Sequence, residues 1–224
     1  MEVVAVIVGE SVLGGFIVGG RALLLLLLVG GCAVQPPIVK PAMGTMASRS
    51  MAFDSIAVPP LGADSWSEQV ATAARWHLQN RKAGNRRDCS SLVNAILMRA
   101  GFAVTGNSKT HWQRAEEEGR VVEVPFPGAL VVFDYTYDAN ANGLVDDELT
   151  HIGVVLEVGR DGTVTIVHFG SGRVTELKMN LQEPSIRSRD GRILNDTLRS
   201  PSYGPKDGPR LAGQLFHGYV RPPR

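Results

Sequence analysis

Three residues of the sequence, Cys89, His151 and His168, have side chains that can carry out acyl transfer together. A cysteine thiol can act as a nucleophile, and an imidazole can take its proton and return it to a leaving group. His151 opens one apolar, β-branched run and His168 closes the next. If these runs pair as a hairpin through 159–162, both imidazoles lie at one end of the sheet. There His151 can serve as the base and His168 can orient it.

Cys89 follows an Arg-rich polar loop at the point where a helix is predicted to begin. A thiol at a helix start lies near unpaired N–H groups and the positive end of the dipole, so we expect a lowered pKa. The backbone N–H groups of Cys89 and Ser90 would hold the oxyanion of a tetrahedral intermediate. The alternative is that Cys89 is a small buried hydrophobic residue, the commoner role of a single cysteine.

The elements that position these residues are predicted from hydrophobic periodicity and turn signals, starting at residue 64 or 65. Helices are expected over 65–79, 88–100 and 112–118, and strands over 129–133, 152–158, 163–169 and 214–220. Helices followed by antiparallel strands indicate an α+β fold in which the N-terminal helices pack on an antiparallel sheet. The segment 184–210, rich in Arg, Asp, Pro and Gly, is predicted to be a long loop without an assigned role.

Four segments resemble, in order, the NlpC-type cysteine peptidases, a papain-like family of cell-wall endopeptidases. They are the nucleophile motif at 88–93, the strand at 127–133, the histidine strand at 150–155 and the third polar residue within 167–169. The resemblance covers about 64–222 and implies a Cys89–His151–His168 triad. The cysteine precedes the histidine, unlike in permuted relatives that act on lipids.

The chain departs from the family pattern at several positions. Ser91 stands where glycine is usual, and Ala129 replaces an acid. The tyrosine and paired glycines that commonly precede the nucleophile are replaced by Trp76, His77 and Leu78 and then the polar stretch 81–87. Because that region helps to shape the oxyanion site in the family, the departure indicates a different specificity.

The function implied by the resemblance is hydrolysis of amide bonds in peptidoglycan stem peptides through a thioester acyl-enzyme. The same residues would also serve an N-acetylmuramoyl-L-alanine-type amidase, which cuts between sugar and peptide. A third alternative, from another class, is a non-catalytic cell-envelope lipoprotein that binds wall peptide. The sequence leaves these three open.

The first 31 residues are predicted to be a signal peptide, because Arg21 precedes the apolar run 22–29 and small residues follow it. Residues 28–32 resemble the lipobox of bacterial lipoproteins, which implies a lipid on Cys32 at the mature N-terminus. The Pro-rich stretch 32–63 reads as a flexible tether. The expected location is the cell envelope after export, anchored to the outer membrane or the periplasmic face. A single transmembrane helix is the alternative.

Oxygen-bearing residues before His151 resemble the first part of an EF-hand-type calcium loop. The candidate ligands are Asp138, Asn140, Asn142, Leu144 (through its carbonyl), Asp146, Asp147 and Glu148. The twelfth position is Leu149 rather than Glu, so a bidentate ligand would come from Asp147 or Glu148. No cofactor is expected to be required, and the alternative is a polar loop without metal.

The charge balance is nearly even, with 23 Lys and Arg against 22 Asp and Glu and a net charge of +1. Nucleic acid is therefore not an expected partner, and we expect a monomer. His77, His111 and His217 have no acidic or thiol neighbours at metal spacing, so no zinc site is predicted. The basic residues at 81–87, including Arg86, could meet substrate carboxylates, but a solvated charged surface is the more common reason for such a run.

Overall fold

The computed structural model describes residues 65–205 and 207–223, and the predicted signal peptide, Cys32 and the tether lie outside them. Three helices lead the described part of the chain: α1 (Ser65–Gln79), α2 (Cys89–Arg99) and α3 (Ser108–Glu117). Within those described residues, no helix has the length and apolar character needed to cross a bilayer. The prediction of N-terminal helices is confirmed, and α3 begins four residues earlier than the pattern suggested.

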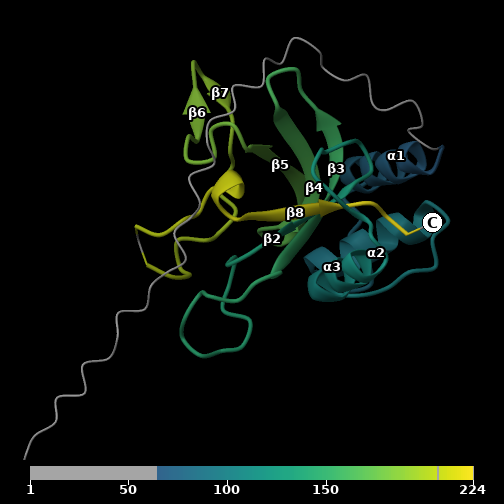
Figure 1. Ribbon diagram of the computed structural model, residues 1–224, viewed down its shortest axis with the longest axis horizontal. Helices are drawn as coiled ribbons and strands as arrows, with labels where there is room; N and C mark the ends of the chain where they lie inside the picture. Colours follow the sequence, from purple (N-terminus) through teal and green to yellow (C-terminus); the bar gives the residue numbers. More distant parts are fainter. Residues whose placement is uncertain (1–64, 206, 224) are drawn as a thin grey trace, which may run out of the picture. The chain divides into compact units, whose positions relative to one another are not determined.

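A six-stranded antiparallel sheet follows the helices, in the order β1-β8-β2-β3-β4-β5 (Figure 1). Its strands are β1 (Val121–Val122), β2 (Leu130–Phe133), β3 (His151–Val158), β4 (Thr163–Gly170), β5 (Arg173–Asn180) and β8 (Phe216–Val220). A small separate hairpin is formed by β6 (Ser188–Arg189) and β7 (Arg192–Ile193), and a 3₁₀ turn, η1 (Ala212–Gln214), precedes β8. The predicted α+β fold with an antiparallel sheet is confirmed.

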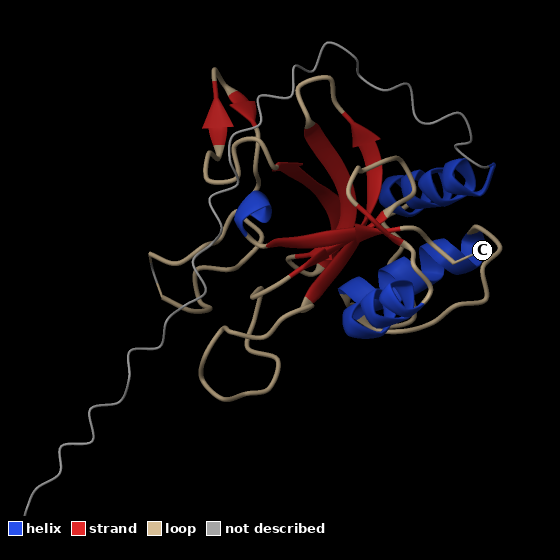
Figure 2. Ribbon diagram, in the orientation of Figure 1, coloured by secondary structure: helices blue, strands red, loops and turns tan. Residues whose placement is uncertain are grey.

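The two faces of the sheet have different coverings (Figure 2). On one face the apolar sides of the helices pack against alternate strand residues, for example Leu92 and Ile96 of α2 against Ile152 and Val154 of β3. Burial of this apolar surface is the main force that docks the helices on the sheet. α2, which begins with the candidate nucleophile, is therefore fixed against the strand that begins with His151.

The other face carries a second core built from the opposite set of strand residues. Its members are Ala129, Val131, Phe133, Val155, Val164, Ile166, Leu177, Met179, Ala212, Leu215 and Tyr219. The segment predicted as an unassigned loop contributes to this covering through Leu198, and it contains β6 and β7. Buried Asn195 pins the segment, because its amide oxygen accepts from the N–H groups of Asn180 and Gly213 while its NH₂ donates to two carbonyls.

Two strands of the sheet are absent from the sequence prediction, the two-residue β1 and the eight-residue β5, which form its two edges. β5 pairs with β4 along its whole length at the sheet edge, with Gly170 opposite Arg173. Its burial does not alternate regularly, because both Met179 and Asn180 are buried while Glu176 is not. The period-two pattern that identifies a half-buried strand is therefore broken in this segment.

Candidate active site

Cys89 is the first residue of α2, and Asp88 caps that helix. The Asp88 side chain accepts from the Ser91 backbone N–H at 2.7 Å, so one of the unpaired N–H groups of the first turn is already used. The preceding loop passes very close to this turn, since a Cβ on Gly84 would lie 2.0 Å from the Ser91 carbonyl oxygen. Only glycine at position 84 allows that approach, which holds the Arg-rich loop against the start of α2.

The electrostatics of the thiol differ from the sequence expectation. Burial raises the pKa of Cys89 above its ordinary value, and the Asp88 carboxylate adds to the rise. The backbone N–H groups of Ile152 and Ser90 and the Ser90 hydroxyl act in the opposite direction without overcoming it. The prediction of a lowered pKa is therefore wrong, because desolvation outweighs the helix start. The resting nucleophile is a neutral thiol that needs a base.

His151 and His168 meet at one end of the sheet, as the predicted hairpin requires. Nε2 of His151 lies 2.9 Å from Nδ1 of His168, and both side chains are buried. Burial lowers the pKa of His168 to about 4. It also holds the pKa of His151 well below its ordinary value, with His168 adding to the effect. Both rings are therefore neutral at pH 7, and one donates a hydrogen bond to the other.

Two glycines make room for the His168 ring and its strand. A Cβ on Gly170 would lie 2.4 Å from Cε1 of His168, and one on Gly153 would lie 2.6 Å from Ile166. Either added side chain would displace the packing that sets the 2.9 Å contact between the two imidazoles. The ring of Phe133 lies beside them, 6.0 Å from the His151 centroid. The pair is thus fixed by apolar packing rather than by charge.

The thiol and the imidazole pair approach each other through β3. The Ile152 N–H faces the Cys89 sulfur, and Ile152 directly follows His151. Thr150, on the other side of His151, lines the same cleft as Cys89. Both imidazoles lie below this surface, since His151 and His168 are 8% and 5% exposed. The structure therefore brings the three predicted residues into one region, with the Ile152 N–H as a contact that the sequence did not indicate.

A second pair, His217 with Asp134, supports the loop that leads into β3. Asp134 accepts from the Leu149 N–H at 2.7 Å through one oxygen and lies 2.8 Å from Nδ1 of His217 through the other. The His217 ring stands edge-to-face on Trp112, with centroids 4.3 Å apart. Leu149 has a left-handed backbone with φ 57, so its N–H is held in an uncommon geometry. The sequence missed this pair because its members are 83 residues apart.

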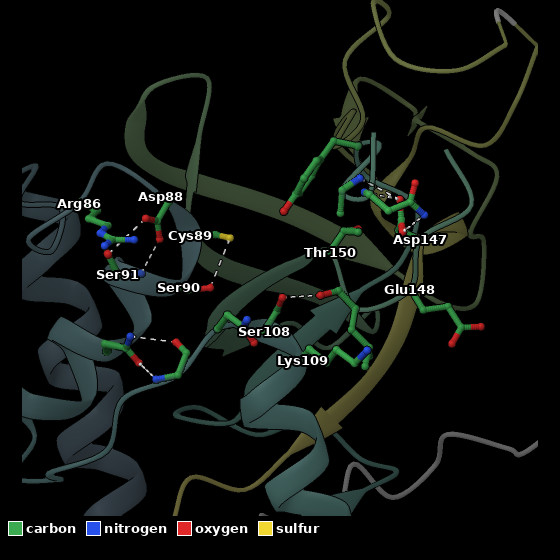
Figure 3. A pocket seen from close by; sticks show the side chains of 17 residues that line it. Arg86, Asp88, Cys89, Ser90, Ser91, Ser108, Lys109, Asp147, Glu148 and Thr150 are labelled. Carbon is green, nitrogen blue, oxygen red and sulfur yellow. Dashed lines mark hydrogen bonds between the residues drawn. The ribbon is translucent and has the colours of Figure 1, made fainter. Parts of the chain in front are cut away.

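Cys89 opens onto a cleft of about 710 Å³ (Figure 3). One wall comes from the start of α2 and the loop before it, and the other from the segment that leads into β3. The start of α3 also contributes, where the Ser108 hydroxyl donates to the Leu149 carbonyl. The charged residues that line the cleft are Arg86, Asp88, Lys109, Asp147 and Glu148, and Tyr137 adds an aromatic surface. A cleft of this size accommodates a short peptide.

The predicted calcium loop forms a compact turn in which side-chain oxygens accept from backbone N–H groups. Asp138 accepts from Asn142 and Gly143, and Asp147 accepts from Ala139 and Asn140. Gly143 has φ 86, as the sixth position of such a loop requires. No cluster of three or more His, Cys, Asp or Glu residues is arranged to hold a metal among the residues described. Because the predicted ligands include amides and a carbonyl, calcium binding stays a prediction.

The other residues named from the sequence have local roles. His77 lies 2.6 Å from the Lys82 carbonyl, and buried His111 lies 2.8 Å from the Asn94 amide oxygen. Arg87 donates to the Gly172 carbonyl, whereas Arg86 lines the cleft. The basic loop is therefore divided between a structural contact and the candidate site.

Comparison with protein families identifies the region that contains this site. Residues 76–169 match the family model described as the CHAP domain. The matched region includes α2, the cleft, β3 and both histidines of the buried pair. No curated protein matches the chain significantly.

Proposed function

We propose a triad mechanism for this chain, because its residues 76–169 match the CHAP domain. This is a papain-like family of cysteine peptidases and amidases related to the NlpC type. A CHAP domain implies a cysteine- and histidine-dependent amidase or peptidase that acts on peptidoglycan. Our proposal is that Cys89 attacks an amide of the stem peptide, His151 is the base and His168 orients it. The observation that carries it is the 2.9 Å contact of the buried imidazoles beside the strand residue whose N–H faces the thiol.

The proposed acylation step transfers one proton and forms one covalent bond. His151 takes the thiol proton while the sulfur attacks the scissile carbonyl carbon, which becomes tetrahedral. The backbone N–H groups of Cys89 and Ser90, at the start of α2, would stabilise the oxyanion. The protonated imidazole then gives its proton to the leaving nitrogen as the C–N bond breaks, leaving a thioester on Cys89. Water attacks the thioester with His151 again as the base, and the thiol is restored.

The protonation states of the site support a base that works at neutral pH. His151 must have a lone pair on Nδ1 to accept the thiol proton, so its Nε2 must carry hydrogen and donate to Nδ1 of His168. The two buried imidazoles are neutral and in contact, so His151 can hold this tautomer without a charged partner. Because the pKa of the thiol is raised and the pKa of the base is lowered, the resting pair is neutral. Charge then develops only as substrate reacts.

Two alternatives remain within reach of the same residues. An amidase that cuts between sugar and peptide would use the same nucleophile and base, and the bond cleaved distinguishes it. A non-catalytic wall-binding protein would retain the cleft without needing either imidazole. The buried histidine pair favours an enzyme, because burying two imidazoles is costly and gives a binding surface no advantage.

For the segment before the described domain, we propose export by the predicted signal peptide and anchoring through a lipid on Cys32. The domain would then act on the wall from a membrane surface, as a monomer tethered by residues 32–63. Mass spectrometry of the mature protein tests the anchor. A diacylglyceryl group on Cys32 is expected, and a chain that retains its first 31 residues would contradict it.

The enzymatic proposal is tested by digesting peptidoglycan with the purified protein and with Cys89→Ala. Released fragments are identified by mass spectrometry, which also reveals which amide is cut. Met98→Ala is a matched control on the same helix, because Met98 is 62% exposed. The wild-type protein and this control should release the same fragments, and Cys89→Ala should release none. Equal fragment profiles from all three proteins would refute the proposal.

A further inference from the structure

We propose that the cleft beside Cys89 selects acidic peptides, with Arg86 and Lys109 binding free carboxylates on the two sides of the scissile amide. The inference rests on the proposed function and names the substrate feature that determines specificity. It concerns two residues outside the triad, one in the loop before α2 and one in the first turn of α3.

Both cations line the cleft and neither is committed to another group. Arg86 and Lys109 are exposed, and among residues 65–205 and 207–223 neither has a hydrogen-bond or ion-pair partner. In Figure 3 they lie on opposite sides of the Cys89 sulfur. The neighbouring Arg87 shows the contrast, because its guanidinium donates to the Gly172 carbonyl. Arg86 is therefore the basic residue of this loop that lines the cleft and has no partner of its own there.

Three acids also line the cleft, but none of them forms an ion pair or hydrogen bond with Arg86 or Lys109, because their nearest donors are neutral groups. Asp88 accepts from the N–H and the hydroxyl of Ser91, and Asp147 accepts from Ala139 and Asn140. Glu148 is only weakly engaged, 3.5 Å from the Tyr135 hydroxyl. The two cations therefore have no ion-pair partner among the side chains of the cleft, although its three carboxylates outnumber them. A carboxylate of the substrate, held at each cation, would be such a partner.

The chemistry of stem peptides provides such carboxylates and a neutral mimic of each. Isoglutamyl and diaminopimelyl residues carry free carboxylates, which become carboxamides of nearly the same size when amidated. Arg and Lys form charge-assisted hydrogen bonds with a carboxylate, whereas a carboxamide offers them only an ordinary, weaker hydrogen bond. One such bond corresponds to about a tenfold difference in affinity or in kcat/KM. Free-carboxylate peptides should therefore be preferred over amidated ones by about that factor.

The test measures kcat/KM for a stem tetrapeptide whose isoglutamyl and diaminopimelyl carboxylates are both free, and for two versions in which one or the other of these carboxylates is amidated. The variants are Arg86→Gln and Lys109→Gln, with Arg75→Gln as the control, because Arg75 is an exposed cation of α1 outside the cleft. Wild type and Arg75→Gln should show the preference at both positions. Each cleft variant should lose the preference at one position, so that the ratio of kcat/KM for the free peptide to kcat/KM for the peptide amidated there falls from about ten to about one.

Peptide binding to the Cys89→Ala protein separates this inference from the proposed function. Calorimetry with the same three peptides should show the same preference, and Cys89→Ala/Arg86→Gln should lose it at one position. If wild type cleaves all three peptides equally, and they bind equally, the inference fails while the hydrolase stands. If no peptide is cleaved but the binding preference and its loss are seen, the carboxylate site stands and the proposed function fails. Identical preferences in both cleft variants and the control would overturn the inference.

Discussion

The domain contains two side-chain pairs that are built in opposite ways, the imidazoles of His151 and His168 and the His217 imidazole with the Asp134 carboxylate. His151 and His168 are buried, contact each other and have no acid partner among the described residues. His217 is less buried and lies 2.8 Å from the Asp134 carboxylate, which also holds the Leu149 N–H. A buried neutral pair can exchange protons, whereas a histidine against a carboxylate and Trp112 is suited to holding a loop in place. The comparison predicts a chemical role for one pair and a structural role for the other.

The largest effect expected from this comparison concerns catalysis. His151→Ala should lower kcat/KM on peptidoglycan peptide by at least about 10³-fold, because the general base is lost. His217→Ala should lower it by less than about tenfold, since only the support of the loop changes. Initial rates with circular dichroism as a check of folding would measure both. Similar losses in the two variants would contradict the division of roles.

A pH dependence of stability follows from the buried pair. The pKa of His168 is lowered to about 4, so the unfolded chain binds protons that the folded chain does not as pH falls from 7 to 5. Stability should therefore decrease on acidification, and His168 should contribute about 2 kcal/mol of that loss at pH 5. Denaturant unfolding at pH 7 and pH 5 measures this loss. Between these pH values, the free energy of unfolding should fall by about 2 kcal/mol less in His168→Asn than in wild type.

His111 provides an independent check on this assignment. Its pKa is also lowered to about 4 by burial, and it lies in α3 outside both pairs. His111→Gln should reduce the acid-dependent loss by a similar amount, about 2 kcal/mol, without abolishing activity. If neither variant changes the difference in unfolding free energy between pH 7 and pH 5, the buried imidazoles are not the groups that titrate.

The structural pair should affect the free energy of unfolding at neutral pH. Asp134→Ala leaves the Leu149 N–H and the His217 ring without an acceptor, and should lower the free energy of unfolding by about 2 kcal/mol. Asp134→Asn keeps an oxygen that can accept from Leu149, so about half of that loss should be recovered. Urea denaturation of the two variants measures the difference. Equal losses would show that the Leu149 contact is not what Asp134 contributes.

The smallest effect on stability is expected from calcium at the predicted loop 138–148, which precedes Leu149. If the loop binds calcium with a dissociation constant of about 1 mM, then 10 mM calcium should stabilise the protein by about 1.4 kcal/mol over EDTA. Magnesium at the same concentration should have less effect, and Asp146→Asn should reduce the calcium effect. Thermal unfolding of both proteins in each buffer provides the measurement. No difference between calcium and EDTA would reject the metal site.

The sequence by itself determined the three helices, the four strands at 129–133, 152–158, 163–169 and 214–220, and the residues that could react. Apolar spacing placed α2 over nearly its observed length, and the glycines at 159 and 162 indicated the hairpin that joins His151 to His168. These features depend on residues close together in the chain, where local conformation and period decide the outcome. β5 was missed because its burial pattern does not alternate.

Only the tertiary structure decided what surrounds each reactive group. The raised pKa of Cys89 depends on burial by distant segments, and the Asp134–His217 pair joins residues 83 positions apart. Desolvation and long-range pairing are sums over neighbours that the fold brings together, and no local spacing encodes them. For the same reason, only the folded chain showed that Arg86 and Lys109 line one cleft while Arg87 is held elsewhere.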